Sequence, residues 1–464
     1  MYMQRLRART DKETLAVGRR PRFFINTYGC QMNARESEQL SGALELAGFE
    51  PAPLETEADL VLYNTCCVRE NAENKIIGNL GLSKFRKETK PDLIVVFCGC
   101  MAREKEMLAY LTERHGYIDI IFGTNNRRRF PEMLCKFLET GQRVIDVSDD
   151  AQTDAPESDM DARALVARHR QYKTGVNVMY GCDNFCAYCI VPYVRGRERS
   201  REPGDILREV AALADDGVKE IMLLGQNVNS YGANLKSPVT FAELLRKVNG
   251  VGKLSRIRFM TSHPKDFSDE LIDALRDCEK VCKSVHLPLQ SGSGRVLAAM
   301  NRRYTQEGYL ALTERLRASV PGVAITTDII VGFPGETEED FLETLRVVNR
   351  VRFEGAFTFL YSKREGTPAA KMSDAVPAQI MKDRFKRLLE TVNPIILAKN
   401  QSRVGETVQV MAEDDPPGKN GTLTGRADDN TLVHFCGKNP VAPGELLNVR
   451  ITEAKTFYLT GTEA

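Results

Sequence analysis

Three features that the sequence lacks exclude whole classes of protein: long apolar runs, an excess of one charge, and an apolar stretch near the N-terminus. No apolar run approaches the roughly 20 residues that a membrane-spanning helix needs, so we expect no membrane association. Acidic and basic residues are balanced, with 63 Asp and Glu against 64 Lys and Arg, so the net charge does not indicate a nucleic-acid partner. The basic segment Met1–Arg22 contains no apolar stretch, so we expect it not to be a secretory signal; Asp11 and Glu13 argue against a transit peptide.

The composition is that of a globular protein with several domains. The chain has 464 residues, of which 42% are hydrophobic and 27% charged, and this excludes wholesale disorder. It contains 12 cysteines. Without a secretory signal, so many cysteines indicate a reducing compartment, where they serve metal binding or catalysis rather than disulfides. We therefore expect a cytoplasmic protein.

Residues 21–147 alternate short apolar runs with stretches of helical periodicity. Glu36–Ala47 and Glu70–Lys87 are typical of helices. The apolar runs are typical of buried strands and lie at Arg22–Asn26, Asp59–Tyr63, Leu93–Phe97 and Asp119–Phe122. This alternation predicts an α/β domain with a doubly wound parallel sheet. We expect a basic tail, residues 1–20, before it, and an acidic linker, residues 148–171, after it.

The alternation of strands and helices resumes in residues 172–400. Six strand candidates lie at Val176–Tyr180, Glu220–Leu224, Arg256–Thr261, Ser284–Leu289, Ala324–Val331 and Ala356–Tyr361. Helical patterns follow most of them, which predicts a partial, TIM-like (β/α)6 barrel. A longer helical pattern, Pro377–Gln401, ends the region, and we expect Pro394 to kink it.

The pattern changes again in residues 401–464. Short strand candidates are separated there by Gly and Asp-Asn turns, which predicts a small all-β barrel of the OB type. The candidates are Thr407–Met411, Gly421–Arg426, Thr431–Phe435, Leu446–Glu453 and Thr456–Thr460.

The most specific motif is a group of three cysteines after the first strand of the predicted barrel. Cys182, Cys186 and Cys189 have the spacing C-x3-C-x2-C. Three thiolates this close suit three irons of a 4Fe-4S cluster and leave the fourth iron without a protein ligand. Zinc is the alternative, but it would require a fourth Cys or His nearby. An open iron predicts chemistry rather than a purely structural site.

A second group of cysteines follows the strands of the N-terminal domain. Cys30 follows the first strand, Cys66 and Cys67 the second, and Cys98 and Cys100 the third. The carboxyl ends of parallel strands meet at one edge, so three thiolates there are expected to converge and to suit a second cluster. Cys98 continues an apolar run and is expected in the core, whereas Cys100 precedes a helix. The pattern leaves the choice between Cys66 and Cys67 open.

From about Phe23 to the C-terminus, the chain resembles the methylthiotransferase family of radical S-adenosylmethionine (SAM) enzymes. Thr261–Pro264 and Asn301–Tyr304 are most similar to the members that act on isopentenyl-adenosine in tRNA. The motifs that carry the resemblance are Thr27–Asn33, Asn64–Cys66, Gly99–Ala102, Met260–Pro264, His286–Ser293, Met300–Thr305 and Thr327–Thr337, together with the three-cysteine motif.

The resemblance implies two 4Fe-4S clusters and SAM as cofactors. It assigns Cys182, Cys186 and Cys189 to the cluster that binds SAM, and it selects Cys30, Cys66 and Cys100 for an auxiliary cluster. It implies that one SAM methylates a sulfur on the auxiliary cluster while a second supplies a 5′-deoxyadenosyl radical. The methylthio group then goes to carbon 2 of an isopentenylated adenosine at position 37 of tRNA. Expected SAM-binding residues are Gln290, Ser291, Gly332 and Glu336.

The resemblance also implies partners. We expect the anticodon loop of tRNA, a reductant protein such as a flavodoxin or ferredoxin, and a monomeric enzyme. The C-terminal module resembles the TRAM domain, an RNA-binding barrel, so removing Gln401–Ala464 should weaken tRNA binding. That segment has six Lys and Arg but nine Asp and Glu. Either its basic residues cluster on one face or the arginines of the central domain bind tRNA. The two sets are Lys419, Arg426, Lys438 and Arg450, and Arg195, Arg197, Arg199 and Arg201.

Other interpretations remain open. A related substrate is threonylcarbamoyl-adenosine in tRNA, or an aspartate of a ribosomal protein. A different class is a non-catalytic iron–sulfur protein that carries electrons or binds RNA. Charge runs such as Arg127–Arg129 and Arg195–Arg201 are usually solvated faces. We expect packing roles for His263 and His286 and for the remaining cysteines, Cys135, Cys278, Cys282 and Cys436.

Overall fold

The computed structural model describes residues 1–67, 70–148, 171–415, 418, 421–438 and 440–464. The chain forms two compact units. Unit 1 comprises Met1–His169 together with Ile190–Arg197, and unit 2 comprises Arg170–Cys189 together with Glu198–Ala464. All but the first and last residues of the predicted linker lie outside the described residues. No described helix has the length and apolar character required to cross a membrane.

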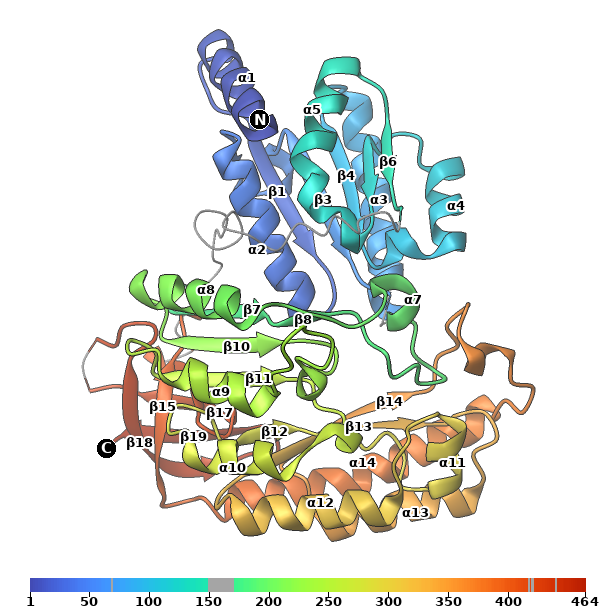
Figure 1. The fold of residues 1–464 in the computed structure, drawn as a ribbon, viewed down its shortest axis with the longest axis vertical. Coiled ribbons are helices and arrows are strands. Elements are labelled where there is room, and N and C mark those ends of the chain that lie inside the picture. Colours follow the sequence, from blue (N-terminus) through green and yellow to red (C-terminus); the bar gives the residue numbers. More distant parts are fainter. Residues whose placement is uncertain (68–69, 149–170, 416–417, 419–420, 439) are drawn as a thin grey trace. The chain divides into compact units, whose positions relative to one another are not determined.

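Unit 1 is built on one parallel six-stranded sheet (Figure 1). The strand order is β2-β1-β3-β4-β5-β6, and every pairing is parallel. The bounds are β1 Arg22–Thr27, β2 Glu50–Pro51, β3 Leu60–Thr65, β4 Ile94–Gly99, β5 Ile120–Phe122 and β6 Val144–Asp146. The two central strands, β3 and β4, are buried at every position, which explains their continuous apolar runs.

Helices cover both faces of this sheet, as its two separate apolar cores require. Alternate residues of β3 enter the two cores: Leu60 and Leu62 one, Val61 and Tyr63 the other. The helices are α2 Gln31–Leu46, α3 Glu70–Thr89, α4 Lys105–Arg114 and α5 Phe130–Thr140, with short 3-10 turns at Glu55–Glu57, Met101–Arg103 and Thr124–Arg129. The predicted doubly wound α/β fold is confirmed.

The first 20 residues are not the tail that their basic composition predicts. They form helix α1, Tyr2–Val17, whose Leu6 side chain is 1% exposed and belongs to the core that α2 and α5 also build. Thr10 is also buried, and its hydroxyl donates to the carbonyl oxygen of Ala47 at 2.6 Å. The prediction was wrong because most residues of this segment are polar or charged, so the few positions that pack against the core give no clear apolar pattern.

The first part of unit 2 contains six parallel strands in two three-stranded sheets. Their orders are β11-β10-β7 and β12-β13-β14. The bounds are β7 Lys173–Asn177, β10 Glu220–Leu224, β11 Arg256–Met260, β12 Ser284–His286, β13 Ala324–Val331 and β14 Gly355–Leu360. Helices pack on one side of the strands (Figure 1): α8 Pro203–Asp215, α9 Phe241–Asn249, α10 Asp269–Asp277, α11 Gly294–Ala299, α12 Gln306–Ser319 and α13 Glu338–Val351. This is the predicted partial (β/α)6 arrangement.

One detail of this region differs from the sequence prediction. The first strand ends at Asn177, and Met179–Tyr180 forms a separate strand, β8, that pairs antiparallel with β9, Arg199–Ser200. The chain leaves the main sheet here because the cysteine loop lies between β8 and β9. The long helix is α14, Ala378–Gln401, which has Pro394 inside it; the kink at Pro394 stays a prediction.

The end of unit 2 is a closed five-stranded barrel in the order β15-β16-β17-β19-β18. Its strands are β15 Thr407–Ala412, β16 Leu423–Ala427, β17 Leu432–Cys436, β18 Leu446–Ala454 and β19 Tyr458–Glu463. Two buried arginines of β11 hold it: Arg256 Nη1 donates to the Arg426 carbonyl at 2.7 Å, and Arg258 Nη2 to the Ala427 carbonyl at 2.9 Å. The small β-barrel therefore docks near the amino end of β11, opposite the strand ends that carry the cysteine motif.

Candidate metal centres

The cysteines of unit 1 gather at one edge of its sheet. Strands β1, β3 and β4 are neighbours, and Cys30, Cys66 and Cys100 come just after their carboxyl ends. The Cys66 thiol interacts with both Cys30 and Cys100. Cys66 and Cys100 are buried, whereas Cys30 is exposed. The sheet thus brings together the three thiols whose convergence the strand pattern predicted.

Two glycines make this approach possible. Gly29 has a φ of +119°, and a Cβ added there would lie 2.2 Å from the Cβ of Cys66. Gly99 has a φ of +100°, and a Cβ there would lie 2.3 Å from the Thr65 carbonyl oxygen. Only a residue without a side chain fits either backbone conformation and either space. The glycine before Cys30 and the glycine before Cys100 therefore allow the strand ends to converge.

A network of buried amides ties the same strand ends together. Asn33 Nδ2 donates to the Thr65 carbonyl at 2.9 Å, and Asn64 Nδ2 donates to the Asn33 carbonyl at 2.9 Å. Asn33 Oδ1 lies 3.3 Å from the Cys30 sulfur. Each amide is 1% exposed or less, so these bonds are shielded from water. The network holds the first turn of α2, which begins after Cys30, against β3.

The three thiols of the set differ in acidity. A hydrogen bond from Cys66, aided by the positive charge of Arg195, lowers the pKa of Cys30 to about 6. Hydrogen bonds from Cys66 and Cys67 place the pKa of Cys100 well below its usual range, whereas the bonds to Cys100 and Cys30 raise the pKa of Cys66. Iron binds the thiolate form, so two members are poised to lose their protons.

The structure distinguishes the members of the two cysteine pairs. Cys66 contacts both Cys30 and Cys100, whereas Cys67 is bonded to Cys100 and Glu104 and belongs to the apolar core. Cys98 lies within β4 in the opposite core, where burial raises the pKa of its thiol. The predicted core position of Cys98 is confirmed, and Cys66 is the better placed of its pair.

Three arginines that the sequence pattern assigned to solvent are paired with buried carboxylates, and two of them, Arg195 and Arg127, lie beside this set. Arg195 is 4% exposed, and its Nη1 donates to Glu36 Oε1 at 2.8 Å. Arg127 also contacts Glu36 Oε1, at 3.2 Å. Arg201, in the same basic run as Arg195, is buried against Glu209 at 2.6 Å. The prediction of solvated faces is therefore wrong for these arginines. A usable signal was the acid Glu36, six residues after Cys30 on α2.

The cysteines of unit 2 lie in one loop between β8 and β9. Cys182 and Cys186 are buried and Cys189 is partly exposed. Burial raises the pKa of Cys182 to about 12. The Cys189 N–H donates to the Cys186 carbonyl at 2.9 Å, so the last two cysteines share a tight turn. Residues around the motif hold the loop, because Glu198 Oε1 accepts from the Asp183 N–H at 3.3 Å.

The loop Met300–Thr305 is hydrogen-bonded to the cysteine loop. Asn301 Nδ2 donates to the Phe185 carbonyl at 2.9 Å, and the Met300 carbonyl accepts from the Ala187 N–H at 2.9 Å. Arg302 is buried, and its Nη1 donates to the Cys186 sulfur at 3.5 Å. The sequence analysis assigned no role to Arg302. Its position within Met300–Thr305, one of the motifs that carry the family resemblance, could have indicated one.

The four residues expected to bind SAM lie after β12 and β13. Glu336 Oε2 accepts from the Gly332 N–H at 2.8 Å and from Arg384 at 3.0 Å, so this carboxylate shapes the turn. Ser291 Oγ accepts from the Ser293 N–H at 3.2 Å. Gln290, with a φ of +66°, forms a bridge with Ile329. Their contact with SAM stays a prediction.

Unpaired buried polar atoms occur where barrel strands end. In the described residues, Asn177 Oδ1, Ser262 Oγ and His263 Nε2 have no hydrogen-bond partner. Asn177 ends β7, and the other two follow β11. The His263 Nδ1 accepts from the Lys265 N–H at 3.2 Å, which leaves the proton on Nε2 as a buried donor. Burial lowers the pKa of His263 to about 2, so the ring is neutral. These atoms suit a polar ligand in the barrel mouth.

Both cysteine sets fit a cluster better than one metal ion. Among the described residues, no three His, Cys, Asp or Glu side chains are arranged to hold a single ion. In a 4Fe-4S cluster each thiolate binds a different iron, so the sulfurs need not converge on one point. The donors are soft thiols, and an arginine lies beside each set. That chemistry fits iron–sulfur clusters.

Comparison with known families covers most of the chain. The model of the radical SAM superfamily matches residues 176–348, that of "Uncharacterized protein family UPF0004" residues 22–123, and that of the TRAM domain residues 401–462. The tRNA-2-methylthio-N(6)-dimethylallyladenosine synthase of Alkaliphilus oremlandii is 50% identical over 446 residues, which are 96% of this chain and 93% of that relative. The synthase of Acetivibrio thermocellus is 48% identical over 462 residues, 99% and 95% of the two chains.

This chain belongs to the tRNA-2-methylthio-N(6)-dimethylallyladenosine synthase family. The family resemblance seen in the motifs is thereby confirmed. Solved structures agree on the fold. The radical SAM methyltransferase TsrM of Kitasatospora setae aligns with a TM-score of 0.53 at 16% identity, covering 75% of this chain and 73% of that chain. The cobalamin-dependent radical enzyme OxsB aligns with a TM-score of 0.51 at 13% identity, covering 81% and 57%.

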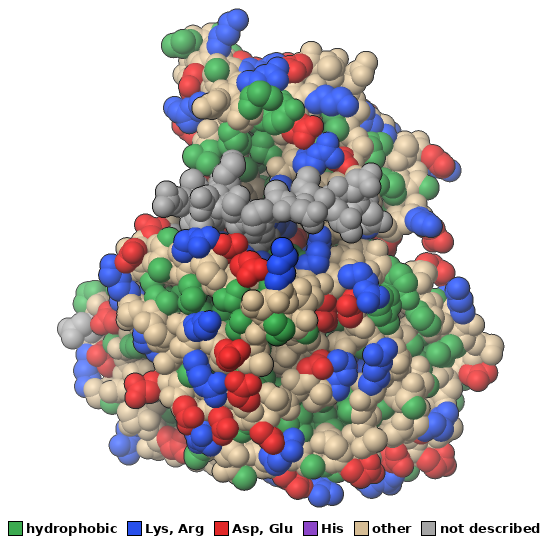
Figure 2. Space-filling view, viewed as in Figure 1, with side chains coloured by type: hydrophobic (Ala, Val, Ile, Leu, Met, Phe, Trp, Pro, Cys, Tyr) green, Lys and Arg blue, Asp and Glu red, His purple; other side chains and the backbone are tan. Residues whose placement is uncertain are grey.

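The basic residues of unit 2 that are candidates for binding tRNA are dispersed. On the visible face of unit 2, Lys and Arg are interspersed with Asp and Glu (Figure 2). In the β-barrel, Arg450 pairs with Thr407 at one end of β15, and Arg426 with Met411 at the other, about 13 Å away at strand spacing. Lys438 follows β17, near Arg450, and Lys419 lies outside the described residues. The three described basic residues, Arg426, Lys438 and Arg450, therefore do not form one cluster.

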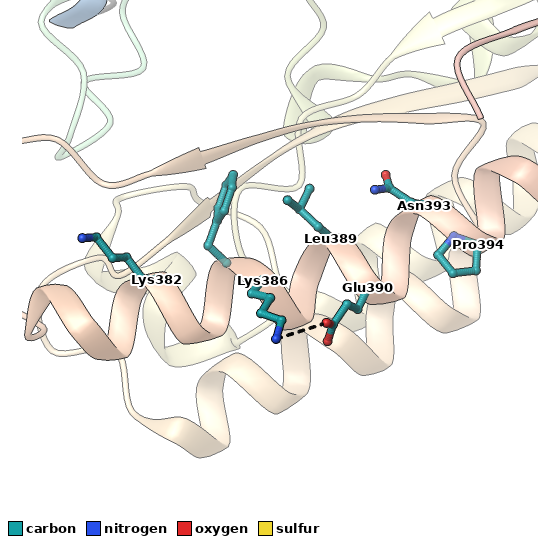
Figure 3. Close-up of a pocket in the computed structure, with 7 residues that line it drawn as sticks. Lys382, Lys386, Leu389, Glu390, Asn393 and Pro394 are labelled. Carbon is teal, nitrogen blue, oxygen red and sulfur yellow. Dashed lines mark ion pairs between the residues drawn. The ribbon is translucent and has the colours of Figure 1, made fainter. Parts of the chain in front are cut away.

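A groove along α14 is not part of this chemistry. Its lining comes from one helix, and Lys386 and Glu390 form an ion pair at its rim at 3.7 Å (Figure 3). It includes no cysteine and none of the expected SAM-binding residues. Cys278 ends α10 and Cys282 precedes β12, both buried in packing positions, as expected.

Proposed function

We propose that this chain converts N(6)-isopentenyladenosine at position 37 of tRNA to its 2-methylthio derivative. It is a radical SAM enzyme that transfers sulfur and methyl to tRNA, as its family membership indicates. The observation that carries the proposal is the pair of three-cysteine sets, one on each unit. A single cluster is enough to cleave SAM, so a second set indicates a place for the sulfur that is inserted.

We assign Cys182, Cys186 and Cys189 to the SAM-binding 4Fe-4S cluster, and Cys30, Cys66 and Cys100 to an auxiliary 4Fe-4S cluster. Together with SAM, these groups supply the radical that removes hydrogen from an unreactive C–H bond, and the sulfur and methyl that replace it. Carbon 2 of adenine has no leaving group and no acidic proton, so polar substitution does not reach it. The protein's own task is to hold the thiols, orient the substrate and exclude water.

SAM is held, in this proposal, at the carboxyl ends of the barrel strands. The expected contacts are Gln290, Ser291, Gly332 and Glu336, and we add the unpaired Ser262 hydroxyl and the His263 Nε2–H group. Both are 5% exposed or less, so an acceptor on SAM or on the base would satisfy a costly unpaired group. A His263→Ala variant should bind SAM or substrate tRNA more weakly by equilibrium titration; unchanged affinity for both contradicts this contact.

The face of β13 and β14 opposite the helices offers a surface for the modified base. Phe357 pairs with Asp328 and Phe359 with Ile330, so these side chains share the face opposite Ile329 and Val331 of the core. Phe357 is 52% exposed and Phe359 37%. Aromatic side chains stack on bases at about 1–3 kcal/mol each, and an isopentenyl group adds apolar surface. Phe357→Ala should raise KM for the isopentenylated tRNA more than it lowers kcat; an unchanged KM argues against this surface.

The TRAM barrel and the remaining partners complete the proposal. Lys438 and Arg450 are exposed at the same end of the barrel and suit a phosphate contact. Changing both to Gln should weaken tRNA binding and reduce its salt dependence by about two units of slope, whereas Arg426→Gln at the other end should not. We further propose a monomeric cytoplasmic enzyme that receives electrons from a flavodoxin- or ferredoxin-like protein.

The decisive experiment is mass spectrometry of tRNA nucleosides. Purified enzyme, SAM and a reductant should convert isopentenyladenosine in tRNA to the methylthio form under anaerobic conditions. A strain without the gene should lack that nucleoside and retain methylthio-threonylcarbamoyl-adenosine. Loss of the second nucleoside alone would reassign the substrate. Absence of 5′-deoxyadenosine in the anaerobic reaction would instead favour a non-catalytic iron–sulfur protein.

A further inference from the structure

One buried arginine lies in a polar network at the cysteine set of unit 1. The two terminal nitrogens of Arg195 donate to the two carboxylate oxygens of Glu36, at 2.8 and 3.3 Å. Its Nη2 also donates to Asn33 Oδ1 at 3.0 Å. The same Asn33 Oδ1 lies 3.3 Å from the Cys30 sulfur, and the guanidinium charge also acts on the sulfur of Cys100. Arg195 therefore joins a carboxylate, an amide and a predicted iron ligand within one buried network.

The charges in this network favour an anion at the cysteines. A buried guanidinium is costly unless opposite charge compensates it. Glu36 is 3% exposed and divides its negative charge between Arg195 and Arg127, which lies 3.2 Å from the same oxygen. Arg195 carries positive charge toward the thiols, because the Asn33 Oδ1 that accepts from it lies 3.3 Å from the Cys30 sulfur. A cluster held by thiolates at this edge would supply compensating negative charge.

Packing holds the arginine in place independently of its ion pair. Arg195 is the last residue of the short helix α7, Val191–Arg195. Val194 of this helix and Ile190, the residue before it, are buried in the apolar core of unit 1. Thr124 Oγ1 donates to the Val194 carbonyl at 2.9 Å. The position of residue 195 is therefore set by apolar burial and a backbone hydrogen bond, so its side chain can be exchanged without releasing the segment.

We propose that Arg195 tunes the cluster held by Cys30, Cys66 and Cys100, through a fixed, buried positive charge beside the sulfurs that Asn33 links to Cys30. The inference rests on the proposed function, which places a cluster there. Positive charge near the sulfurs stabilises the reduced, more negative cluster, so Arg195 raises its reduction potential. Glu36 opposes this effect by offsetting part of the charge.

The two members of the ion pair allow a test with opposite signs. The full-length chain carrying Cys182→Ala, Cys186→Ala and Cys189→Ala would retain only the unit 1 cluster, and its potential is measured by an anaerobic redox titration followed by electron paramagnetic resonance. Arg195→Met should shift the reduction equilibrium toward the oxidised cluster by at least tenfold, about 59 mV for one electron. Glu36→Gln should shift it toward the reduced cluster.

Further variants separate tuning from simple disruption. Arg195→Met leaves Glu36 with Arg127 as its ion-pair partner, so the double variant Arg195→Met/Glu36→Gln removes both members of the Arg195–Glu36 pair. It should still favour the oxidised cluster, because Arg195 is the member that lies beside the sulfurs. Arg195→Lys retains the charge and should restore part of the shift. The matched control is Arg201→Met/Glu209→Gln, a buried pair at 2.6 Å in unit 2, which should leave the potential unchanged.

Each outcome bears on the proposal. Unchanged potentials in all Arg195 and Glu36 variants, at about four irons per chain, would overturn the tuning role while leaving the auxiliary cluster intact. Shifts of the same sign for Arg195→Met and Glu36→Gln would indicate disturbed packing and would also overturn it. If the unsubstituted unit 1 site bound no iron in the triple-alanine background, the proposed auxiliary cluster itself would be wrong.

Discussion

The two cysteine sets differ in how the chain assembles them. Cys182, Cys186 and Cys189 lie in one short loop, so their proximity is largely given by covalent connection. Cys30, Cys66 and Cys100 come from the ends of three neighbouring strands and meet only when the sheet of unit 1 has formed. The first set is local in sequence and the second depends on the fold, so the second should be the more sensitive to changes outside its ligands.

The sets also differ in the arginine beside them. Arg195 shares the carboxylate of Glu36 while its charge acts on Cys100. Arg302 contacts Cys186, and its Nη2 donates to the Pro288 carbonyl at 3.0 Å; no carboxylate in the described part of the chain lies within ion-pair distance of it. The positive charge beside Cys186 is therefore less offset by nearby carboxylates than the charge beside Cys30 and Cys100.

The largest expected effect separates the roles of the two sets. Cys182→Ala should abolish formation of 5′-deoxyadenosine from SAM, because the open iron is lost. Cys30→Ala should retain SAM cleavage and abolish methylthio transfer to tRNA. Chromatography of the anaerobic reaction with a strong reductant measures the first product, and nucleoside mass spectrometry the second. Loss of SAM cleavage in both variants would mean that the sets do not act separately.

Iron content distinguishes the neighbouring cysteines of the auxiliary set. The reconstituted protein should bind about eight irons, Cys66→Ala about four, and Cys67→Ala about eight, because only Cys66 contacts both other thiols. Colorimetric iron determination after anaerobic desalting measures this. Loss of four irons in Cys67→Ala alone would reverse the assignment.

A glycine substitution tests whether the auxiliary set depends on the fold. Gly29→Ala forces a Cβ to 2.2 Å from the Cβ of Cys66, so it should lower iron content to about four per chain without touching a ligand. Gly141→Ala is the matched control: its φ is also positive, at +65°, but no atom lies within 4 Å of an added Cβ. About four irons in both variants would assign the loss to backbone strain, and about eight in both would contradict the role of Gly29.

The smallest expected effect concerns the arginine of the SAM-binding set. Arg302→Met should slow SAM cleavage by about tenfold to a hundredfold, the usual cost of removing a group that supports a metal ligand, and should leave auxiliary iron in place. The initial rate of 5′-deoxyadenosine formation, measured beside iron content, tests this. Arg302→Lys should recover little, because lysine lacks the fork that bonds both Cys186 and Pro288.

Much of the architecture was predictable because each part has a strong local pattern. The continuous apolar runs of β3 and β4 indicated a buried parallel sheet, and the Gly and Asp-Asn turns after Gln401 indicated a small β-barrel. Helix α1 was missed because few of its positions are apolar, and packing on α2 and α5 stabilises it. The break after Asn177 was missed because it reflects pairing of β8 with the distant β9.

By itself, the sequence determined which residue types can hold iron and where each lies relative to a strand, because spacing and apolar periodicity are properties of neighbouring residues. Only the tertiary structure decided that Cys66 touches both Cys30 and Cys100. It also decided that Arg195 is a buried partner of Glu36 rather than part of a solvated basic run. The physical reason is that burial and ion pairing depend on surfaces contributed by segments far apart in the chain, and no local pattern records which surfaces will meet.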